Sequence, residues 1–103
     1  MYPADIEAVA ERFPGVNDLC CFPVEDPHYG QNIGLALVMD DSSPATLKEL
    51  HAWLRRHLGE HQMPVRWFLL DALPRTSRGK INRDHIADVC RAETPVDLRK
   101  LLA

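Results

Sequence analysis

Residues 75–83 form a short basic segment that holds the residue types with the clearest chemical potential in this 103-residue sequence. Its four cationic side chains belong to Arg75, Arg78, Lys80 and Arg83, and no acidic residue lies among them. Such a segment repels itself, so an anionic ligand, a phosphate or an acidic partner surface would explain its presence. A solvated basic turn is the alternative interpretation, and charge alone does not separate the two.

The dipeptide Gly79-Lys80 invites comparison with the P-loop, in which a glycine-rich backbone and a lysine bind nucleotide phosphates. That motif requires a glycine at position 74 and Ser or Thr at position 81, where this chain has Pro74 and Ile81, so the comparison fails. What is left is a loop lysine that follows a glycine and is flanked by arginines. A flexible ammonium group suits reaching across a gap to a negative group, whereas planar guanidinium groups suit fixing a surface in place.

Other potentially reactive residues carry weaker signals. His57 and His61 have the i, i+4 spacing of a helical metal site, but the sequence places no third ligand nearby, and we predict a solvated helix face and no metal. The cysteines, Cys20, Cys21 and Cys90, are odd in number, which argues against a disulfide framework and predicts a reducing, cytoplasmic location. Because Cys20 and Cys21 would alternate across a strand, at most one of them should face the core.

Composition and charge distribution narrow the class of protein. Hydrophobic residues make up 46% of the chain and charged residues 26%, as expected for one globular domain with a modest core. No apolar run reaches the roughly 18 residues of a membrane span, and no signal pattern opens the sequence, so no membrane association is expected. Residues 1–41 carry eight acids and one base, and residues 42–103 carry eleven bases and seven acids. The net charge of −3 and the lack of aromatic residues among the basic ones argue against nucleic-acid binding.

Hydrophobic periodicity predicts the elements that must position the basic segment. We expect a first helix from Pro3 that Pro14-Gly15 stops, followed by strands over 16–24 and 33–39 that a turn-rich connection joins. A second helix from 44 to about 61, ended by Met63-Pro64, should then lead to a third strand over 65–70. Ser43 and Asn82 should cap helices, and residues 94–97 should cap a last short one. Residues 71–79 form a polar loop or a small hairpin. The prediction is an α+β fold, with a small three-stranded, mainly antiparallel sheet packed with about three helices.

The segment Leu73-Pro74-Arg75-Thr76-Ser77-Arg78-Gly79-Lys80-Ile81-Asn82-Arg83 closely resembles the last core motif of the adenylate-forming superfamily. This superfamily includes acyl-CoA synthetases, peptide-synthetase adenylation domains and luciferases. The motif runs Leu-Pro-Arg-Thr-x-x-Gly-Lys-x-x-Arg, and every fixed position is present. Further similarities follow in order: the helix start Tyr2-Pro3-Ala4-Asp5-Ile6-Glu7, its ending Pro14-Gly15-Val16, the loop 25–31 with Gln31 where Glu is common, and Met63-Pro64 before the third strand.

The resemblance covers essentially the whole chain and implies that residues 1–103 are a single C-terminal subdomain. The large N-terminal subdomain, which carries the phosphate loop and the acyl pocket, lies outside this sequence and is the expected partner. In the family the small subdomain alternates between two poses. One makes an acyl-adenylate from a carboxylate and ATP, and the other passes the acyl group to a thiol of coenzyme A or pantetheine. We therefore expect ATP, Mg²⁺ and a thiol for the complete acid-thiol ligase, no cofactor in this chain, and no activity from the chain alone.

Lys80 matches the lysine that the family inserts into the active site during adenylation. An ammonium group aimed at the α-phosphate would stabilise the charge that builds there in the transition state. Gly79 would let the loop tip approach closely. Arg75, Thr76, Arg78 and Arg83 would support the loop or line the interdomain surface. The resemblance also implies acetylation and deacetylation of Lys80 as a control. A standalone, non-catalytic binding or regulatory module of the same fold is the alternative.

Overall fold

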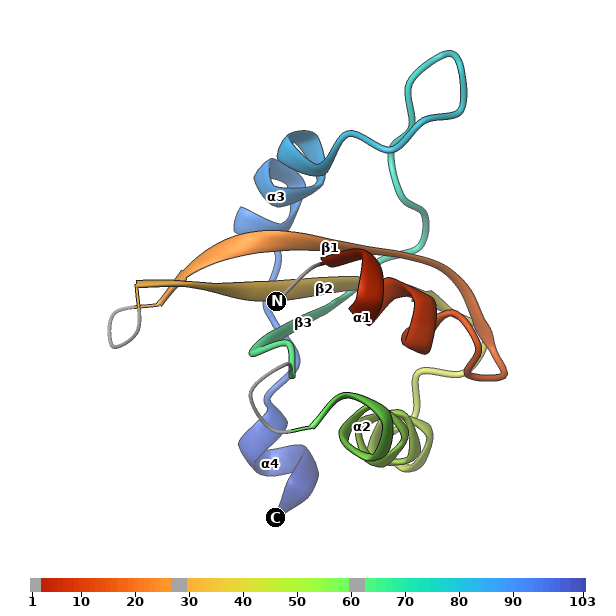
Figure 1. The fold of residues 1–103 in the computed structure, drawn as a ribbon, viewed down its shortest axis with the longest axis vertical. Coiled ribbons are helices and arrows are strands. Elements are labelled where there is room, and N and C mark those ends of the chain that lie inside the picture. The colour runs from red at the N-terminus through yellow and green to blue at the C-terminus, as the bar shows by residue number, and fades with distance from the viewer. Residues whose placement is uncertain (1–2, 27–29, 60–62) are drawn as a thin grey trace.

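A mixed three-stranded sheet with helices on both of its faces forms the centre of the molecule (Figure 1). The computed structural model describes residues 3–26, 30–59 and 63–103. In chain order the elements are α1 (Pro3–Ala10), β1 (Val16–Asp26), β2 (Gly30–Met39), α2 (Pro44–Leu58), β3 (Arg66–Leu69), α3 (Arg83–Arg91) and α4 (Leu98–Leu102). The predicted α+β class is therefore confirmed, and the last short helix brings the helices of the described chain to four.

The strand order in the sheet is β1-β2-β3. Strands β1 and β2 form a long antiparallel hairpin whose register runs from Val16 opposite Met39 to Asp26 opposite Gly30. Strand β3 pairs with β2 in parallel, from Gly34 opposite Arg66 onward. The parallel pairing follows from the connection, because helix α2 carries the chain from one end of β2 back to its start. The longer of the two pairings is antiparallel, as predicted.

The β1–β2 hairpin is longer than the sequence pattern predicts. The stretch 25–32 was expected to be a turn-rich connection, but residues 25–26 and 30–32 belong to the paired strands. Polar residues are poor strand formers on average, yet pairing that begins in the apolar part of a hairpin continues outward as long as each backbone group finds a partner. Part of the expected loop, residues 27–29, lies outside the described residues, as do Tyr2 and His61.

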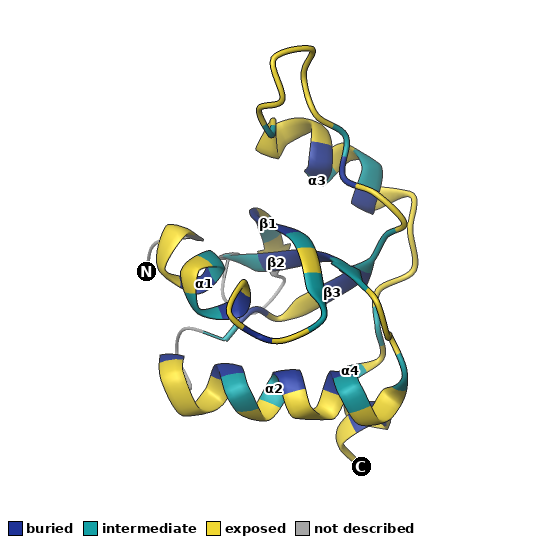
Figure 2. Cartoon of the chain, turned by 90° about the vertical axis from the view of Figure 1, so that its right-hand side faces the viewer, coloured by how far each residue is buried: buried dark blue, intermediate teal, exposed yellow. Residues whose placement is uncertain are grey.

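Both faces of the sheet are buried, which corrects the expectation for the adjacent cysteines. Strand residues alternate between the two faces. Cys21 belongs to the core beneath α1, α2 and α4, and Cys20 belongs to the core beneath α3, and neither is exposed. The prediction that at most one of them faces the core was wrong because it assumed a sheet with one solvated face. Figure 2 shows buried residues along the strands between these helix layers.

The predicted helix boundaries shift at two places. Helix α1 ends at Ala10, although Phe13 still contributes to the core through a tighter turn closed by a Phe13 N–H to Ala10 carbonyl bond of 3.1 Å. Helix α2 ends at Leu58 instead of about 61. Gly59 follows with φ of +79°, a backbone conformation that glycine adopts readily and that stops the helix before Met63-Pro64.

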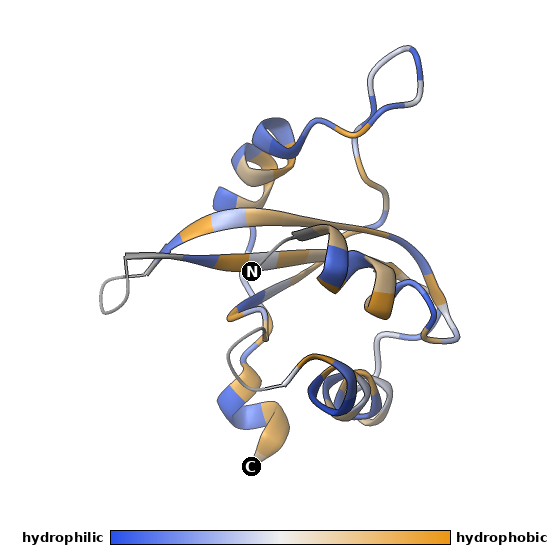
Figure 3. Ribbon diagram, in the orientation of Figure 1, coloured by the Kyte–Doolittle hydropathy of each residue, from blue (hydrophilic) through white to orange (hydrophobic). Residues whose placement is uncertain are grey.

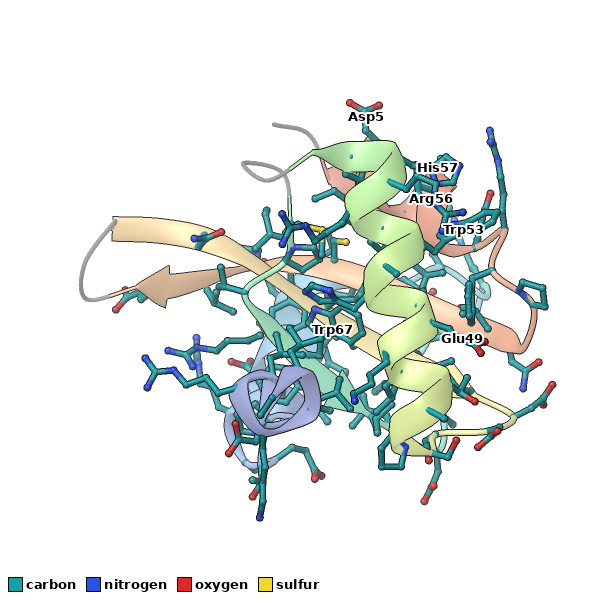
Figure 4. The ribbon with its side chains drawn as sticks, turned by 90° about the horizontal axis from the view of Figure 1, so that it is seen from below. Asp5, Glu49, Trp53, Arg56, His57 and Trp67 are labelled. Atoms are coloured by element: carbon teal, nitrogen blue, oxygen red, sulfur yellow. The ribbon has the colours of Figure 1, made fainter. Side chains whose placement is uncertain are left out.

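The stripe of leucines on α2 faces the sheet and is buried, as its spacing predicts, at Leu47, Leu50, Leu54 and Leu58. Figure 4 shows α2 crossing the sheet, with Trp67 on one side of the helix and Trp53 on the other. Trp67 is fully buried, and the Trp53 indole donates to the Val9 carbonyl at 3.0 Å. Helix α2 therefore joins α1 to the sheet. None of the helices in the described parts of the chain is long and apolar enough to cross a bilayer.

Candidate functional site: a basic hairpin beside the sheet edge

The basic segment folds as a small hairpin that projects from the domain between β3 and α3 (Figures 1 and 2). Arg75 and Ile81 form an isolated antiparallel bridge. Inside it, the Thr76 N–H donates to the Lys80 carbonyl at 2.8 Å and the Gly79 N–H donates to the Thr76 carbonyl at 2.9 Å. Of the two alternatives predicted for this region, a polar loop or a small hairpin, the structure therefore has the hairpin.

The turn explains why glycine occupies position 79. Gly79 has φ of +79°, while Ser77 and Arg78 have negative φ, so the turn requires a left-handed residue only at its last position. This pattern is that of a three-residue hairpin loop in which a glycine follows a tight turn. A Cβ atom at Gly79 would meet no neighbouring atom within 4 Å, so backbone conformation is what favours glycine here.

The base of the hairpin is anchored in the core on the α3 face of the sheet. Leu73 is 7% exposed and belongs to that core, and Ile81 packs against it. Between these anchors, every residue from Arg75 to Lys80 is exposed. Figure 3 shows the polar character of the projecting segment against the apolar strands. The hairpin is thus a polar arm on an apolar base.

Arg75 joins the hairpin to strand β1. Its Nη2 donates to both carboxylate oxygens of Asp18 at 2.7 Å, and its Nη1 donates to the Gly79 carbonyl at 3.0 Å. The Thr76 hydroxyl accepts from the Lys80 N–H at 3.2 Å. Arg75 and Thr76 therefore fix the backbone on both sides of the bond between Gly79 and Lys80.

Arg83 makes the second connection to the same strand, at the first residue of α3. Its Nη2 donates to Glu7 of α1 at 2.6 Å, and its Nε donates to the Cys21 carbonyl at 3.1 Å. Glu7 in turn accepts from the Cys21 N–H at 2.9 Å. Since β1 is an edge strand, this pair of side chains satisfies backbone groups that would otherwise be open to another strand.

The remaining two cations of the segment have no such partner. Among the residues that the structure describes, the side chains of Lys80 and Arg78 make no hydrogen bond or ion pair, and both residues are exposed. The segment thus divides into Arg75 and Arg83, which are neutralised by acids of the N-terminal part of the chain, and two cations that face solvent. Arg75 and Thr76 hold the hairpin backbone and Arg83 ties its end to β1, while the functional support expected of Gly79, Arg75, Thr76, Arg78 and Arg83 stays a prediction.

Sequence reasoning missed the two acidic partners, Asp18 and Glu7. The available signal was the charge imbalance, because the acid-rich residues 1–41 supply the counter-charges for the basic segment. The pairing itself depends on the fold, which brings together residues separated by 57 and 76 positions in the chain. To predict these ion pairs from the sequence, one would have had to know which strand lies at the sheet edge.

Lys80 does not line either of two hollows in the surface of the described residues. One of about 260 Å³ lies beside the hairpin and is lined partly by Glu7, Asp18, Ile81 and Arg83. Another of about 570 Å³ lies beside the C-terminal half of α3 and includes Phe22, Phe68, Ala87 and Cys90. A lysine that lines neither hollow and projects on an exposed arm is suited to act on something outside this chain.

The hairpin and the mixed sheet define a small α+β domain with an exposed lysine on a projecting hairpin, and comparison with known proteins gives this domain its family. Residues 5–80 match the model of the AMP-binding enzyme C-terminal domain. The chain belongs to this family, and the matched range ends at Lys80.

Relatives and solved structures agree with this assignment. The chain is 36% identical over 86 residues to 2-succinylbenzoate–CoA ligase of Staphylococcus aureus, covering 84% of this chain and 17% of that protein. It is 31% identical over 86 residues to oxalate–CoA ligase of Saccharomyces cerevisiae, covering 84% of this chain and 16% of that protein. Among solved structures, o-succinylbenzoate CoA synthetase of Bacillus subtilis with its acyl-adenylate intermediate has a TM-score of 0.75 and 29% identity, over 84% of this chain and 17% of that chain. The chain thus spans about one sixth of the length of these relatives.

Proposed function

We propose that this chain is the mobile C-terminal subdomain of an ATP-dependent, AMP-forming acyl-activating enzyme and that Lys80 supplies its adenylation cation. The complete enzyme would convert a carboxylate and ATP to an acyl-adenylate and pyrophosphate, and would then transfer the acyl group to the thiol of coenzyme A or pantetheine. Family membership and relatives named as CoA ligases support this proposal. The observation that carries the role of Lys80 is its place on an exposed arm whose supporting arginines are already neutralised.

The proposed chemistry is electrostatic. When the carboxylate oxygen attacks the α-phosphorus, the bond to the pyrophosphate oxygen breaks, and negative charge accumulates on the phosphoryl and bridging oxygens. An ammonium group brought against those oxygens in a water-poor interface stabilises the transition state more than the ground state. Lys80 meets two requirements for this role, since its backbone is held by Thr76 while its side chain has no partner among the described residues.

The nucleotide and its metal ion would be held elsewhere. The described residues contain no group of three or more His, Cys, Asp or Glu side chains that could hold a metal ion. We assign ATP, Mg²⁺ and the acyl pocket to an N-terminal adenylation subdomain, supplied in the same chain or as a separate one. Isolated from it, Lys80 would lack the positioning that makes it useful, so this chain alone should not form adenylate.

Exposure of Lys80 also supports acetylation as a control on the enzyme. Acetylation would remove the charge that the proposed mechanism needs, and deacetylation would restore it. A lysine acetyltransferase and a deacetylase are therefore proposed partners at this residue.

The test uses the chain together with its N-terminal subdomain. A panel of carboxylic acids that includes 2-succinylbenzoate and oxalate is screened for trapping of the acyl-adenylate by hydroxylamine, and the best acid is taken for pyrophosphate exchange. Changing Lys80→Ala should lower the rate of adenylate formation by about 10²- to 10³-fold, the usual effect of removing one transition-state donor. Lys48→Ala, which removes an exposed lysine from α2, is the matched control and should leave the rate unchanged.

Two outcomes would contradict the proposal. Adenylate formation that survives the loss of Lys80 would remove the role assigned to this residue. Failure of every acid in the wild-type assembly would instead favour the standalone, non-catalytic module.

A further inference from the structure

Asp18 lies at the point where strand β1 meets the basic hairpin, and its surroundings orient it toward Arg75. The register of the β1–β2 pair shifts between Val16 and Asp18, an irregularity of the kind that redirects side chains at the start of a strand. The Asp18 Oδ1 also accepts from the Leu19 N–H at 3.0 Å. With one oxygen tied to its own strand, the carboxylate presents a fixed acceptor to the guanidinium of Arg75.

Arg75 transmits this fixed position to the residue before Lys80. A guanidinium group is planar and rigid, so anchoring Nη2 on Asp18 sets the direction of Nη1. Nη1 donates to the Gly79 carbonyl at 3.0 Å, which belongs to the same peptide unit as the Lys80 N–H. That N–H donates to the Thr76 hydroxyl at 3.2 Å, and the Lys80 carbonyl accepts from the Thr76 N–H at 2.8 Å. The backbone of Lys80 is therefore restrained on both sides.

The charge of Asp18 matters as much as its hydrogen bonds. Arg75, Arg78, Lys80 and Arg83 lie within nine residues, and their mutual repulsion would open a hairpin that has few apolar contacts beyond its base. Asp18 neutralises Arg75 on the first arm of the hairpin, and Glu7 neutralises Arg83 at the end of the segment. The contact is partly exposed, with 42% of the Arg75 side chain and 27% of the Asp18 side chain accessible, so it contributes little to overall stability.

From these contacts we infer that Asp18 is a positioning residue for Lys80, acting through Arg75 and the Gly79 carbonyl. It makes the hairpin a rigid arm of the sheet, so that Lys80 arrives at the reacting phosphate in one orientation. The inference rests on the proposed function of Lys80. It extends that function to a residue on β1 that lies outside the basic segment and 57 positions from Arg75.

The test compares Asp18→Asn with Glu49→Gln in the assembled enzyme. Each substitution removes one negative charge and keeps the side-chain size, and Glu49 is exposed on α2, on the opposite face of the sheet from α3. Asp18→Asn should slow adenylate formation by between about tenfold and a hundredfold, because displacement of a positioned group by an ångström costs rates of that order. Glu49→Gln should leave the rate unchanged.

A double variant separates positioning from general damage to the fold. If Asp18 acts only through Lys80, then Asp18→Asn should cause no further loss when added to Lys80→Ala. Hydrogen exchange of the peptide 73–83, measured by mass spectrometry in the same assembly, should be faster in Asp18→Asn than in Glu49→Gln. An equal loss of rate in the presence and absence of Lys80 would overturn the inference, and so would an unchanged rate in Asp18→Asn.

The same experiments distinguish failure of the inference from failure of the proposed function. A normal rate in Lys80→Ala removes both. A reduced rate in Lys80→Ala together with a normal rate in Asp18→Asn removes only the role of Asp18.

Discussion

At the scale of single residues, the three cysteine thiols lie in surroundings that oppose their ionisation. Burial, with a smaller contribution from the Glu7 carboxylate, raises the pKa of Cys20 to about 11 from 9.0. Burial likewise raises the pKa of Cys90 to about 11. The pKa of Cys21 is also raised, again chiefly by burial. Because the thiolate is the reactive form, these cysteines serve packing and not nucleophilic catalysis.

The raised pKa of Cys20 predicts a loss of stability at high pH. An unfolded chain releases the Cys20 proton near pH 9, whereas the folded chain keeps it to about pH 11. The folded state thus binds more protons in this interval, and stability that is complete below pH 9 falls as the pH rises toward 11. We expect urea unfolding under reducing conditions to show a smaller free energy at pH 10 than at pH 8.

Cys20→Ala isolates this contribution from other groups that titrate in the same range. The variant should be less stable at pH 8 because it loses buried volume, but its stability should fall less between pH 8 and pH 10. Identical pH dependences for the two chains would contradict the assignment.

At the scale of the elements, the β1–β2 hairpin depends on a close approach between an aromatic ring and a glycine. Phe22 is the register partner of Gly34. A Cβ atom placed on Gly34 would lie 2.8 Å from two ring carbons of Phe22 and 2.8 Å from a methyl carbon of Val24. The absence of a side chain at Gly34 therefore lets Phe22 close over β2, where it is 2% exposed and packs against the Phe68 ring at 5.8 Å.

Gly34→Ala should destabilise the chain by about 1–3 kcal/mol, the usual effect of overpacking a core. The measurement is urea unfolding at neutral pH. Adding Phe22→Leu to Gly34→Ala should recover part of the loss, because a smaller side chain leaves room for the new methyl group, whereas the same change in the wild type should be destabilising. Additive effects of the two substitutions would show that they do not meet.

At the scale of the whole molecule, the Glu7–Arg83 pair joins three elements that are far apart in the sequence. Glu7 belongs to α1, Arg83 begins α3, and both bind the backbone of Cys21 in β1. The pair thus connects the helix layers on opposite faces of the sheet across its edge. The hairpin that carries Lys80 ends at Arg83, so this connection also fixes the position of the arm relative to the sheet.

Glu7→Ala should cost about 1–3 kcal/mol, because it leaves the Cys21 N–H without its acceptor and Arg83 without its counter-charge. Glu11→Ala, an exposed change just beyond the same helix, is the control and should have little effect. In a double-mutant cycle with Arg83→Ala, the two losses should be less than additive. Independent losses would mean that the residues do not form one connection.

Much of this molecule could be predicted from the sequence. The leucine spacing of α2, the Ser43 and Asn82 caps and the apolar strand runs gave the elements and their order. The extent of the hairpin strands and the burial of both Cys20 and Cys21 could not be predicted, since local propensity does not record which faces of a sheet are covered. The end of α2 could not be predicted either, because it depends on the positive φ of Gly59. The sequence permits this conformation at a glycine but does not require it.

The sequence by itself determined the family motif, because the spacing of Lys80 from the glycine and arginines around it is a property of the chain. It also showed that four cations in nine residues repel one another, which favours nearby counter-charges but left a solvated basic turn as the alternative. Only the tertiary structure decided which acids provide counter-charges. Asp18 and Glu7 meet Arg75 and Arg83 because β1 lies at the sheet edge beside α1 and the hairpin. Contacts of this kind depend on distance in space, which the order of residues does not specify, and they leave Lys80 and Arg78 as the cations without a partner among the described residues.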